Sequence, residues 1–455
     1  MKRSSFLILL AGSLLLSCKK EYVPIDVILN RQDCLMIVGD ALTLEATVVS
    51  ETAKNQAVTW HSDNERVATV NSAGKITALA PGTAVITATA GDGRSATAST
   101  ITVGAAGVTM TSTGFYISIL VSGSGNVSVD WGDGAEIKQR KAIGEIRFTH
   151  ECDEQIALHE VTIIGDDIQR LVCSYNKLTT LDVSRNPALK ILECSSNQLT
   201  TLNLSSNTEL ESLGCNNNSL TTLNISSNTA LEYLQCGRNL LSILDVSNNS
   251  ALVSLDCEKN QLITLNVGRN NKLKNLRCME NQLTSLDLNS NTELESLNCV
   301  KNQLTALDLS GFIALQQIYC DENQLSEINV SACALLRSLY CCDNQITTLN
   351  VDGCTALREL LCYNNKMNNL IVSDNTTLYT LFCWDNQLTT LDVSSNTVLN
   401  GLYCHNNQLM ANALNNLFKT LPESYFTRYV RIDGNPGTND CDTSIAEKKG
   451  WDVWK

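Results

Sequence analysis

The sequence predicts a mainly β protein in which more than half of the chain forms a right-handed solenoid of about twelve turns. Three observations support this prediction: a 21-residue repeat over residues 168–410, short alternating strands before it, and an amphipathic helix where the repeat ends. A chain of 455 residues is also too long for one core, which favours several domains.

The repeat is marked by a column of cysteines. Leucine or isoleucine stands two positions before each cysteine, and asparagine stands three positions after it. The twelve cysteines are Cys173, Cys194, Cys215, Cys236, Cys257, Cys278, Cys299, Cys320, Cys341, Cys362, Cys383 and Cys404. The pattern L-x-x-L-x-C-x-x-N-x-L, with a period between 20 and 29, resembles the leucine-rich repeat family in a short bacterial form.

Within one unit, side chains alternate as in a short strand. Leu192 and Cys194 point to one side and Glu193 points to the other. Because one unit cannot bury its few apolar residues alone, neighbouring units must stack into one continuous core. The asparagine amides can then satisfy turn backbone groups in the same unit and in the next. We expect one strand per turn on the concave side and a second inward pair, such as Leu202 and Leu204, in the opposite wall.

The N-terminus carries an export signal. Two basic residues precede an apolar run from Phe6 to Leu16 that is too short to span a membrane as a stable helix. The ending Leu15-Leu16-Ser17-Cys18 resembles the bacterial lipobox, which implies cleavage of residues 1–17, lipidation of Cys18 and a tether over residues 18–24. By the same resemblance, the lack of aspartate after the cysteine favours an outer-membrane lipoprotein. The sequence leaves open which side of the membrane it faces, and a plain secretory signal with a chance cysteine is the alternative.

Residues 25–104 alternate in short strands separated by glycine and polar turns, which is typical of an all-β sandwich. The stretches from Val38 to Leu44, Val58-Thr59-Trp60 and from Ala80 to Thr87 resemble the bacterial Ig-like domain of group 2. The resemblance implies a spacer or adhesion module of a surface protein. We expect Trp60 in its core rather than on a ligand platform.

A second β segment covers residues 107–167, where Trp131-Gly132-Asp133-Gly134 resembles the turn of PKD-like sandwich domains. Asp130 and Asp133 predict turn caps, because two carboxylates fall short of the six to eight oxygens that calcium takes. Zinc wants four ligands, and only three candidates occur here, His150, Cys152 and His159. Since solenoid ends need caps, we expect this segment to cover the apolar edge of the first repeat.

After Leu409 the period fails, and residues 411–455 predict an α/β cap. The expected elements are a helix over Ala411–Leu421, a strand over Tyr429–Ile432, a turn over Gly434–Gly437 and a short helix over Ser444–Lys449. The stretches Asn435-Pro436-Gly437 and Lys449-Gly450-Trp451 resemble C-terminal caps of similar bacterial repeat proteins.

Composition narrows the function classes. A net charge of −14 and a pI near 4.8 would repel a phosphate backbone, so nucleic acid is not an expected partner. The sequence has no Ser-His-Asp set, paired-carboxylate frame, P-loop or H-E-x-x-H motif, and its four histidines are scattered. We therefore predict a monomeric, non-enzymatic protein without cofactor or metal. An enzyme built on the repeat, a lyase or hydrolase, would need a pair of active-site carboxylates.

The cysteine column is expected to stay mostly reduced. In-register parallel strands place neighbouring Cβ atoms ~4.8 Å apart, just beyond the ~3.5–4.5 Å that a disulfide allows. A buried thiol behaves as a small hydrophobe and fits where leucine would crowd the wall. Cys333 and Cys354, which replace a second asparagine in adjacent units, are the expected exception, and Cys342 is expected to face outward.

The outward positions beside the cysteine column differ along the solenoid. The first seven units carry small or charged residues there, whereas the last five carry seven rings in a chain with only 5% aromatics. We call these seven the aromatic patch: Tyr319, Tyr340, Tyr363, Phe382, Trp384, Tyr403 and His405. Its predicted acidic rim is Asp321, Glu322, Asp343 and Asp385.

The aromatic patch supports two interpretations. Exposed aromatics usually mark a binding site, and these would suit a protein or a glycan on the concave face. Alternatively, the rings stiffen the sheet near its cap through cross-strand pairs or contact the cap itself, in a structural envelope component without a specific ligand. The favoured function is a lipid-anchored recognition or adhesion protein whose ligand-binding residues are the aromatic patch with Asp321, Asp343 and Asp385.

Overall fold

The computed structural model describes residues 26–49, 57–152, 157–331 and 333–455. The chain divides into two compact units after Val103. The predicted signal peptide, Cys18 and the tether lie outside the described residues. Across the described ranges, no helix is long and apolar enough to cross a membrane.

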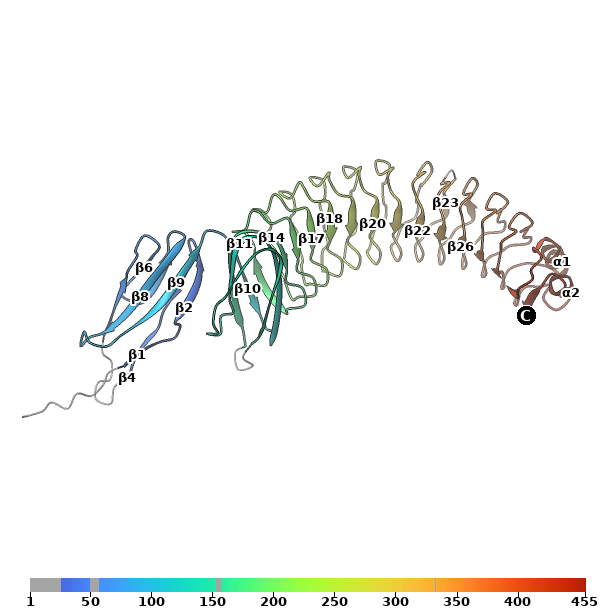
Figure 1. The fold of residues 1–455 in the computed structure, drawn as a ribbon. Coiled ribbons are helices and arrows are strands. Elements are labelled where there is room, and N and C mark those ends of the chain that lie inside the picture. Colours follow the sequence, from blue (N-terminus) through green and yellow to red (C-terminus); the bar gives the residue numbers. More distant parts are fainter. Residues whose placement is uncertain (1–25, 50–56, 153–156, 332) are drawn as a thin grey trace, which may run out of the picture. The chain divides into compact units, whose positions relative to one another are not determined.

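The first unit is a β-sandwich (Figure 1). Its sheets have the strand orders β2-β9-β8-β5, β3-β7-β6 and β1-β4. Alternate residues of β8, from Ala84 to Ala90, are buried, as the period of a strand requires. Trp60 is partly buried and packs against this core. The strands are β1 (Asp26–Leu29), β2 (Asp33–Ile37), β3 (Ala41–Thr43), β4 (Ala46–Val49), β5 (Val58–Ser62), β6 (Ala68–Val70), β7 (Lys75–Ala78), β8 (Gly82–Ala90) and β9 (Ala96–Gly104).

The second unit begins with an antiparallel β segment that merges into the solenoid. Strand β14 pairs antiparallel with β10 and β11, and its last three residues, Arg170 to Val172, pair in parallel with β16 (Ile191–Glu193). It therefore crosses the predicted boundary at residue 167. Buried residues of this segment and of the repeats form one core, so the segment is no separate domain. Its strands are β10 (Gly107–Ser112), β11 (Tyr116–Asp130), β12 (Lys138–Lys141), β13 (Gly144–Glu151), β14 (His159–Val172) and β15 (Leu178–Asp182).

The repeats form a parallel ladder in which each strand residue lies opposite the residue 21 positions later, as Leu192 does with Leu213 (Figure 1). The strands after β16 are β17 (Ser212–Gly214), β18 (Tyr233–Gln235), β19 (Ser254–Asp256), β20 (Asn275–Arg277), β21 (Ser296–Asn298), β22 (Gln317–Tyr319), β24 (Ser338–Tyr340), β26 (Glu359–Leu361), β27 (Thr380–Phe382) and β28 (Gly401–Tyr403). The ladder continues through β29 (Arg428–Arg431) and β30 (Trp451–Trp454), which gives about 14 turns rather than twelve.

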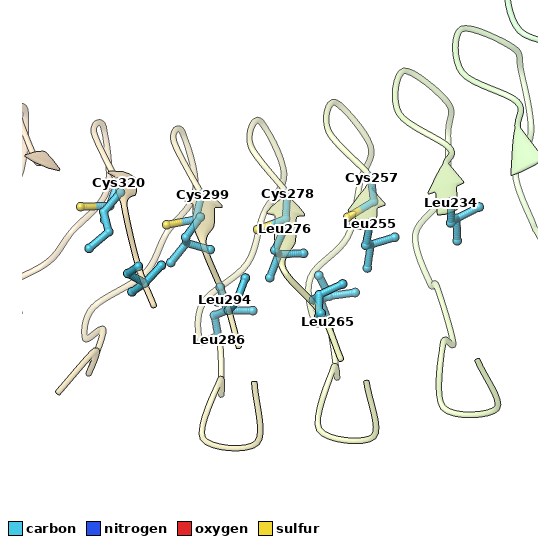
Figure 2. Close-up of a cluster of buried hydrophobic side chains, with 14 of the residues drawn as sticks. Leu234, Leu255, Cys257, Leu265, Leu276, Cys278, Leu286, Leu294, Cys299 and Cys320 are labelled. Carbon is cyan, nitrogen blue, oxygen red and sulfur yellow. The ribbon is translucent and has the colours of Figure 1, made fainter. Parts of the chain in front are cut away.

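The interior of the solenoid is filled by the cysteine and leucine columns. Figure 2 shows Cys257, Cys278 and Cys299 pointing inward from successive strands, with Leu265 and Leu286 reaching in from the opposite wall. The side chains of all twelve cysteines of the column are fully buried. The predicted mainly β solenoid is confirmed.

A ladder of buried asparagines holds the turns together. The amide nitrogen of Asn218 donates to the carbonyls of Cys215 in its own turn and Cys194 in the preceding turn, both at 3.1 Å. Its carbonyl oxygen accepts the N–H of Leu199 at 3.0 Å. The predicted role of the asparagines is confirmed, but the second turn they bond is the preceding one rather than the next.

A second asparagine ladder is less complete. Asn207 donates to the carbonyls of Val183 and Asn186, at 3.0 and 2.8 Å, while its own carbonyl oxygen has no partner. Phe312, Cys333 and Cys354 interrupt this ladder. At this interruption the opposite wall forms two paired strands, β23 (Glu327–Asn329) and β25 (Thr348–Asn350).

Both cysteines of this interruption are free thiols. Cys354 donates to the carbonyl of Val330 at 3.2 Å, the same relation that Asn207 has with Val183. Cys333 likewise donates to Leu309 at 3.5 Å. All 18 cysteines in the described residues are buried. The structure thus shows no bridge between Cys333 and Cys354 within the described chain.

The C-terminal cap has the predicted order of elements. Helix α1 (Ala411–Thr420) buries Leu414, Leu417 and Phe418, which lie on one face because of their spacing. Helix α2 (Ser444–Glu447) follows β29, and β30 then ends the sheet, a strand that the sequence analysis did not predict. The cap therefore closes the core and also lengthens the parallel sheet.

Candidate ligand-binding surface

The in-register ladder brings the aromatic patch together. Tyr319 lies opposite Tyr340, and Phe382 lies opposite Tyr403, on neighbouring strands. Tyr363, Trp384 and His405 each follow a column cysteine directly, on three successive turns. Residues 21 positions apart thus become spatial neighbours, as predicted.

The rings are stacked on one another. Tyr363 and Trp384 are nearly parallel with ring centroids 3.9 Å apart, and His405 stacks on Trp384 at 5.2 Å. Phe382 and Tyr403 stack at 4.6 Å. Trp384 therefore has another ring on each face, whereas Tyr319 and Tyr340 meet edge to face at 5.0 Å.

The predicted acidic residues occupy three different environments. Asp321 is half-buried, accepts the N–H of Cys342 at 2.8 Å, and burial raises the pKa of its carboxyl. Asp343 is half-buried, has a positive φ in the turn and accepts a hydrogen bond from Asn364 at 2.5 Å. Asp385 is exposed in the same turn position one unit further along than Asn364. Asp385 is thus a solvent-facing rim residue, whereas Asp321 supports the sheet from within.

Cys342 does not face outward as predicted. It follows a column cysteine, but only 1% of its surface is accessible, because Asp321 and Tyr363 cover it. Burial, followed by the charge of Asp321, raises the pKa of its thiol far above the ordinary value. This thiol belongs to the packed base of the patch.

Polar groups also hold two other members of the patch in place. Tyr340 donates its hydroxyl to Glu359 at 2.7 Å, and Ser338 donates to the same carboxylate at 3.2 Å. His405 is buried beside Trp384, and its Nδ1 has no partner among the described atoms. Burial, reinforced by the charge of Arg431, lowers the pKa of His405. The imidazole is thus kept neutral at pH 7.

The surface extends onto the cap, which the sequence analysis missed. In register with Tyr403 the ladder continues with Arg431 and then Trp454. Trp454 lies 6.1 Å from the Tyr403 ring and 5.3 Å from Tyr429, and 44% of its surface is exposed. The available signal was the strand pattern of residues 428–431 and 451–454, but their spacing departs from 21 residues.

Two more exposed rings lie in the loop before β29. Tyr425 is fully exposed, and 83% of the Phe426 surface is exposed. Tyr429 follows on the strand itself and is 39% exposed. We call Tyr425, Phe426, Tyr429 and Trp454 the cap aromatics. Of these four, Trp454 and Tyr429 continue the aromatic surface from Tyr403 onto the cap.

The first turns carry charge instead. Glu258 lies between Arg238 and Arg277, with hydrogen bonds of 3.1 and 2.6 Å to the two guanidinium groups. Burial raises the pKa of the Glu258 carboxyl, but the hydrogen bond and charge of Arg277, with those of Arg238, hold it below its ordinary value. The carboxylate is ionised and oriented.

The turn over Trp131-Gly132-Asp133-Gly134 is held by its own residues. Asp130 accepts the N–H of Gly132 at 2.9 Å, and Asp133 accepts that of Ala135 at 3.0 Å, so the predicted turn caps are confirmed. Asp133 also pairs with His150 at 2.6 Å, and His150 stacks on the buried Trp131. In the part of the chain that the structure describes, no three His, Cys, Asp or Glu side chains are grouped to hold a metal.

Comparison with known proteins identifies the N-terminal module. Residues 27–101 match the family described as bacterial Ig-like domain (group 2). The chain thus combines a bacterial Ig-like domain with a leucine-rich-repeat solenoid.

Particular relatives cover only parts of the chain. The functional domain of InlJ from Listeria monocytogenes, described as including a cysteine ladder, is 33% identical with a TM-score of 0.47 over 57% of this chain and 59% of that one. YopM from Yersinia enterocolitica is 24% identical with a TM-score of 0.46 over 59% and 56%. A lacto-N-biosidase of Bifidobacterium bifidum is 46% identical over 65 residues, 14% of this chain and 6% of that protein. The chain spans less than two thirds of each of these proteins.

Proposed function

We propose that this chain is a non-enzymatic recognition or adhesion protein of the bacterial envelope, whose ligand is a protein that docks on the cap aromatics and the adjoining aromatic patch. The observation that carries the proposal is the exposure of four cap rings, Tyr425, Phe426, Tyr429 and Trp454. Trp454 contacts both Tyr429 and Tyr403 of the preformed aromatic stack. Exposed Trp and Tyr at a rigid surface are the residues that most often dominate protein–protein affinity.

The stacking geometry favours a protein over a glycan at this surface. A sugar ring needs the open face of an aromatic ring, but both faces of Trp384 are occupied by Tyr363 and His405. The half-exposed Trp454 instead suits apolar side chains of a partner. Exposed Asp385 and the net charge of −14 favour a partner whose contact surface is basic.

The envelope part of the proposal rests on the N-terminal sequence. The lipobox-like ending at Cys18 would anchor the chain to the outer membrane, and the Ig-like domain would act as a stalk. Anchoring would place many copies on one surface, so a modest affinity at each solenoid could still hold a partner surface.

A purely structural role is the second candidate, and the stacked rings favour it in part. Rings that cover one another stabilise the sheet whether or not a ligand exists. Replacing Trp384, Tyr363 and Phe382 by alanine would therefore reduce stability under both hypotheses. The cap aromatics separate the two, because they are exposed and contribute little to the core.

The test uses the soluble chain from residue 19 onward on an array of purified extracellular and cell-surface proteins. The variant F426S/W454A should lose at least about tenfold in affinity for a bound protein, since interface aromatics contribute 2 kcal/mol or more at hot spots. The matched control is Tyr233→Ala, a ring with 47% exposure on an earlier strand. Equal binding by F426S/W454A and the wild type, or no binding to any arrayed protein, would refute the proposed site.

A further inference from the structure

A second candidate site lies at the other end of the strand face, beside the first turns. A groove of about 530 Å³ runs along the positions that follow the column cysteines. Ser195, Asn216 and Gly237, which follow the column cysteines on three successive turns, line it. Tyr175 stands at one end, and Arg238 with Glu258 stands at the other.

Tyr175 differs from every ring of the aromatic patch. Its side chain is 79% exposed, so its ring faces are open to solvent instead of being covered by neighbouring rings. Tyr175 has a positive φ of 62°, as does the residue at the equivalent position of each later turn. Tyr175 is the one aromatic residue at this position in the described turns. An open ring beside a polar groove can receive the apolar C–H face of a flat, hydroxylated ligand.

The polar groups of the groove are preoriented. Asn216 accepts the N–H of Gly237 at 2.8 Å through its carbonyl oxygen, which leaves its amide nitrogen to donate to a ligand. Glu258 is fixed by Arg238 and Arg277 and can accept hydroxyl hydrogen bonds. Gln235 is exposed on the neighbouring strand position and offers both a donor and an acceptor.

We propose that this groove binds a neutral oligosaccharide, with one pyranose ring on Tyr175 and hydroxyl groups bonded to Asn216, Gln235 and Glu258. A pyranose combines an apolar face with a rim of hydroxyls, which matches one open ring and several planar polar groups. From the turn of Tyr175 to that of Glu258 the ladder advances four turns, or ~19 Å at ~4.8 Å per strand, which suits an oligosaccharide better than a single sugar.

Other ligand classes fit the groove less well. Apart from Tyr175, its lining side chains are polar or absent, so a peptide would find no apolar pocket for an anchor residue. The ionised Glu258 would repel a sulfated or phosphorylated ligand, and its two arginine partners are already engaged with it. The groove is also distinct from the protein-docking surface at the cap, so the two proposals can fail independently.

Isothermal titration calorimetry of the chain from residue 19 onward tests the proposal with neutral tetrasaccharides of glucose, mannose, galactose or N-acetylglucosamine, and with a sulfated tetrasaccharide. At least one neutral probe should bind. Tyr175→Ala should then weaken binding by about tenfold or more, whereas Tyr175→Phe, which keeps the ring face, should stay within about twofold. Gln235→Ala should weaken binding about threefold or more through one lost hydrogen bond.

The matched control is again Tyr233→Ala, an exposed ring that does not line the groove. Each variant is checked for an unchanged melting temperature, which its exposed position predicts. The proposal is overturned if no neutral probe binds, if only the sulfated probe binds, or if Tyr175→Ala binds as the wild type does. It is equally overturned if Tyr233→Ala loses as much affinity as Tyr175→Ala.

Discussion

Replacing Asn302 by alanine should lower the free energy of unfolding far more than replacing Asn291 by alanine. This is expected although Asn291 is the more deeply buried of the two. Asn302 belongs to the complete ladder. Its amide nitrogen donates to Cys278, Cys299 and Val300 at 3.1, 3.0 and 3.3 Å, and its oxygen accepts the N–H of Leu283 at 3.0 Å. Each hydrogen bond contributes about 0.5–1.5 kcal/mol, and the buried groups left unpaired add a penalty. Asn302→Ala should therefore lower the free energy of unfolding by about 3–5 kcal/mol.

Asn291 belongs to the incomplete ladder. It donates to Val267 and Asn270 at 3.1 and 2.8 Å, but its oxygen has no partner, so alanine removes an unsatisfied buried atom together with two bonds. The net loss should be about 1–2 kcal/mol. Asn291→Cys should cost about 1 kcal/mol or less, because Cys354 already shows a thiol donating to the equivalent carbonyl.

Urea denaturation followed by far-UV circular dichroism measures both changes, with the midpoint and slope fitted for each variant. Equal slopes in the variants and the wild type allow the free energies of unfolding to be compared directly. If Asn302→Ala lost no more stability than Asn291→Ala, the assignment of turn cohesion to the complete ladder would be wrong.

Three further predictions concern the packed side chains. Trp384→Ala should reduce the free energy of unfolding by about 2–4 kcal/mol, because its ring lies between two others. Trp454→Ala should reduce it by less than about 1 kcal/mol, because that ring is half-exposed. Equal losses of stability in thermal melts would contradict the stacking argument. Burial raises the pKa of Cys173 to about 12, so the folded chain should resist a thiol reagent at pH 8. After denaturation without a reducing agent, more than about half of the thiols should react with the reagent. A smaller fraction would indicate disulfides. Folding lowers the pKa of His405 below the ordinary histidine value of 6.5, so below pH 6.5 the unfolded chain binds more protons than the folded chain. The free energy of unfolding should therefore fall as the pH drops through 6.5. His405→Gln should lessen this fall in melting temperature between pH 7 and 5, and an unchanged pH profile would remove His405 as its cause.

The cysteines show which structural features the period-2 alternation of the sequence predicts by itself. The column was assigned to the core from period-2 alternation, and every member is fully buried. Cys342 obeys the same alternation and points to the other face, yet Asp321 and Tyr363 cover it. Alternation predicts the side to which a residue points, but coverage depends on the lengths and rotamers of its neighbours one turn away.

In the aromatic patch, too, the sequence predicts which residues gather but not how their rings cover one another. Its seven members and their gathering on the last turns follow from the 21-residue register. That Trp384 is covered on both faces follows from ring orientation, which no spacing contains. This distinction moves the expected contact surface from the centre of the patch to Tyr429 and Trp454.

By itself the sequence determined the ladder, its core columns, the structural role of the asparagines and the terminal modules, because a period of 21 residues dictates which side chains become neighbours. The tertiary structure alone decided that β14 merges the segment of residues 107–167 into the solenoid and that β30 adds Trp454 to the aromatic surface. It also decided that Tyr175 stands open above a groove. These features arise where the period begins or ends, so packing between unlike segments, rather than repetition, sets their positions.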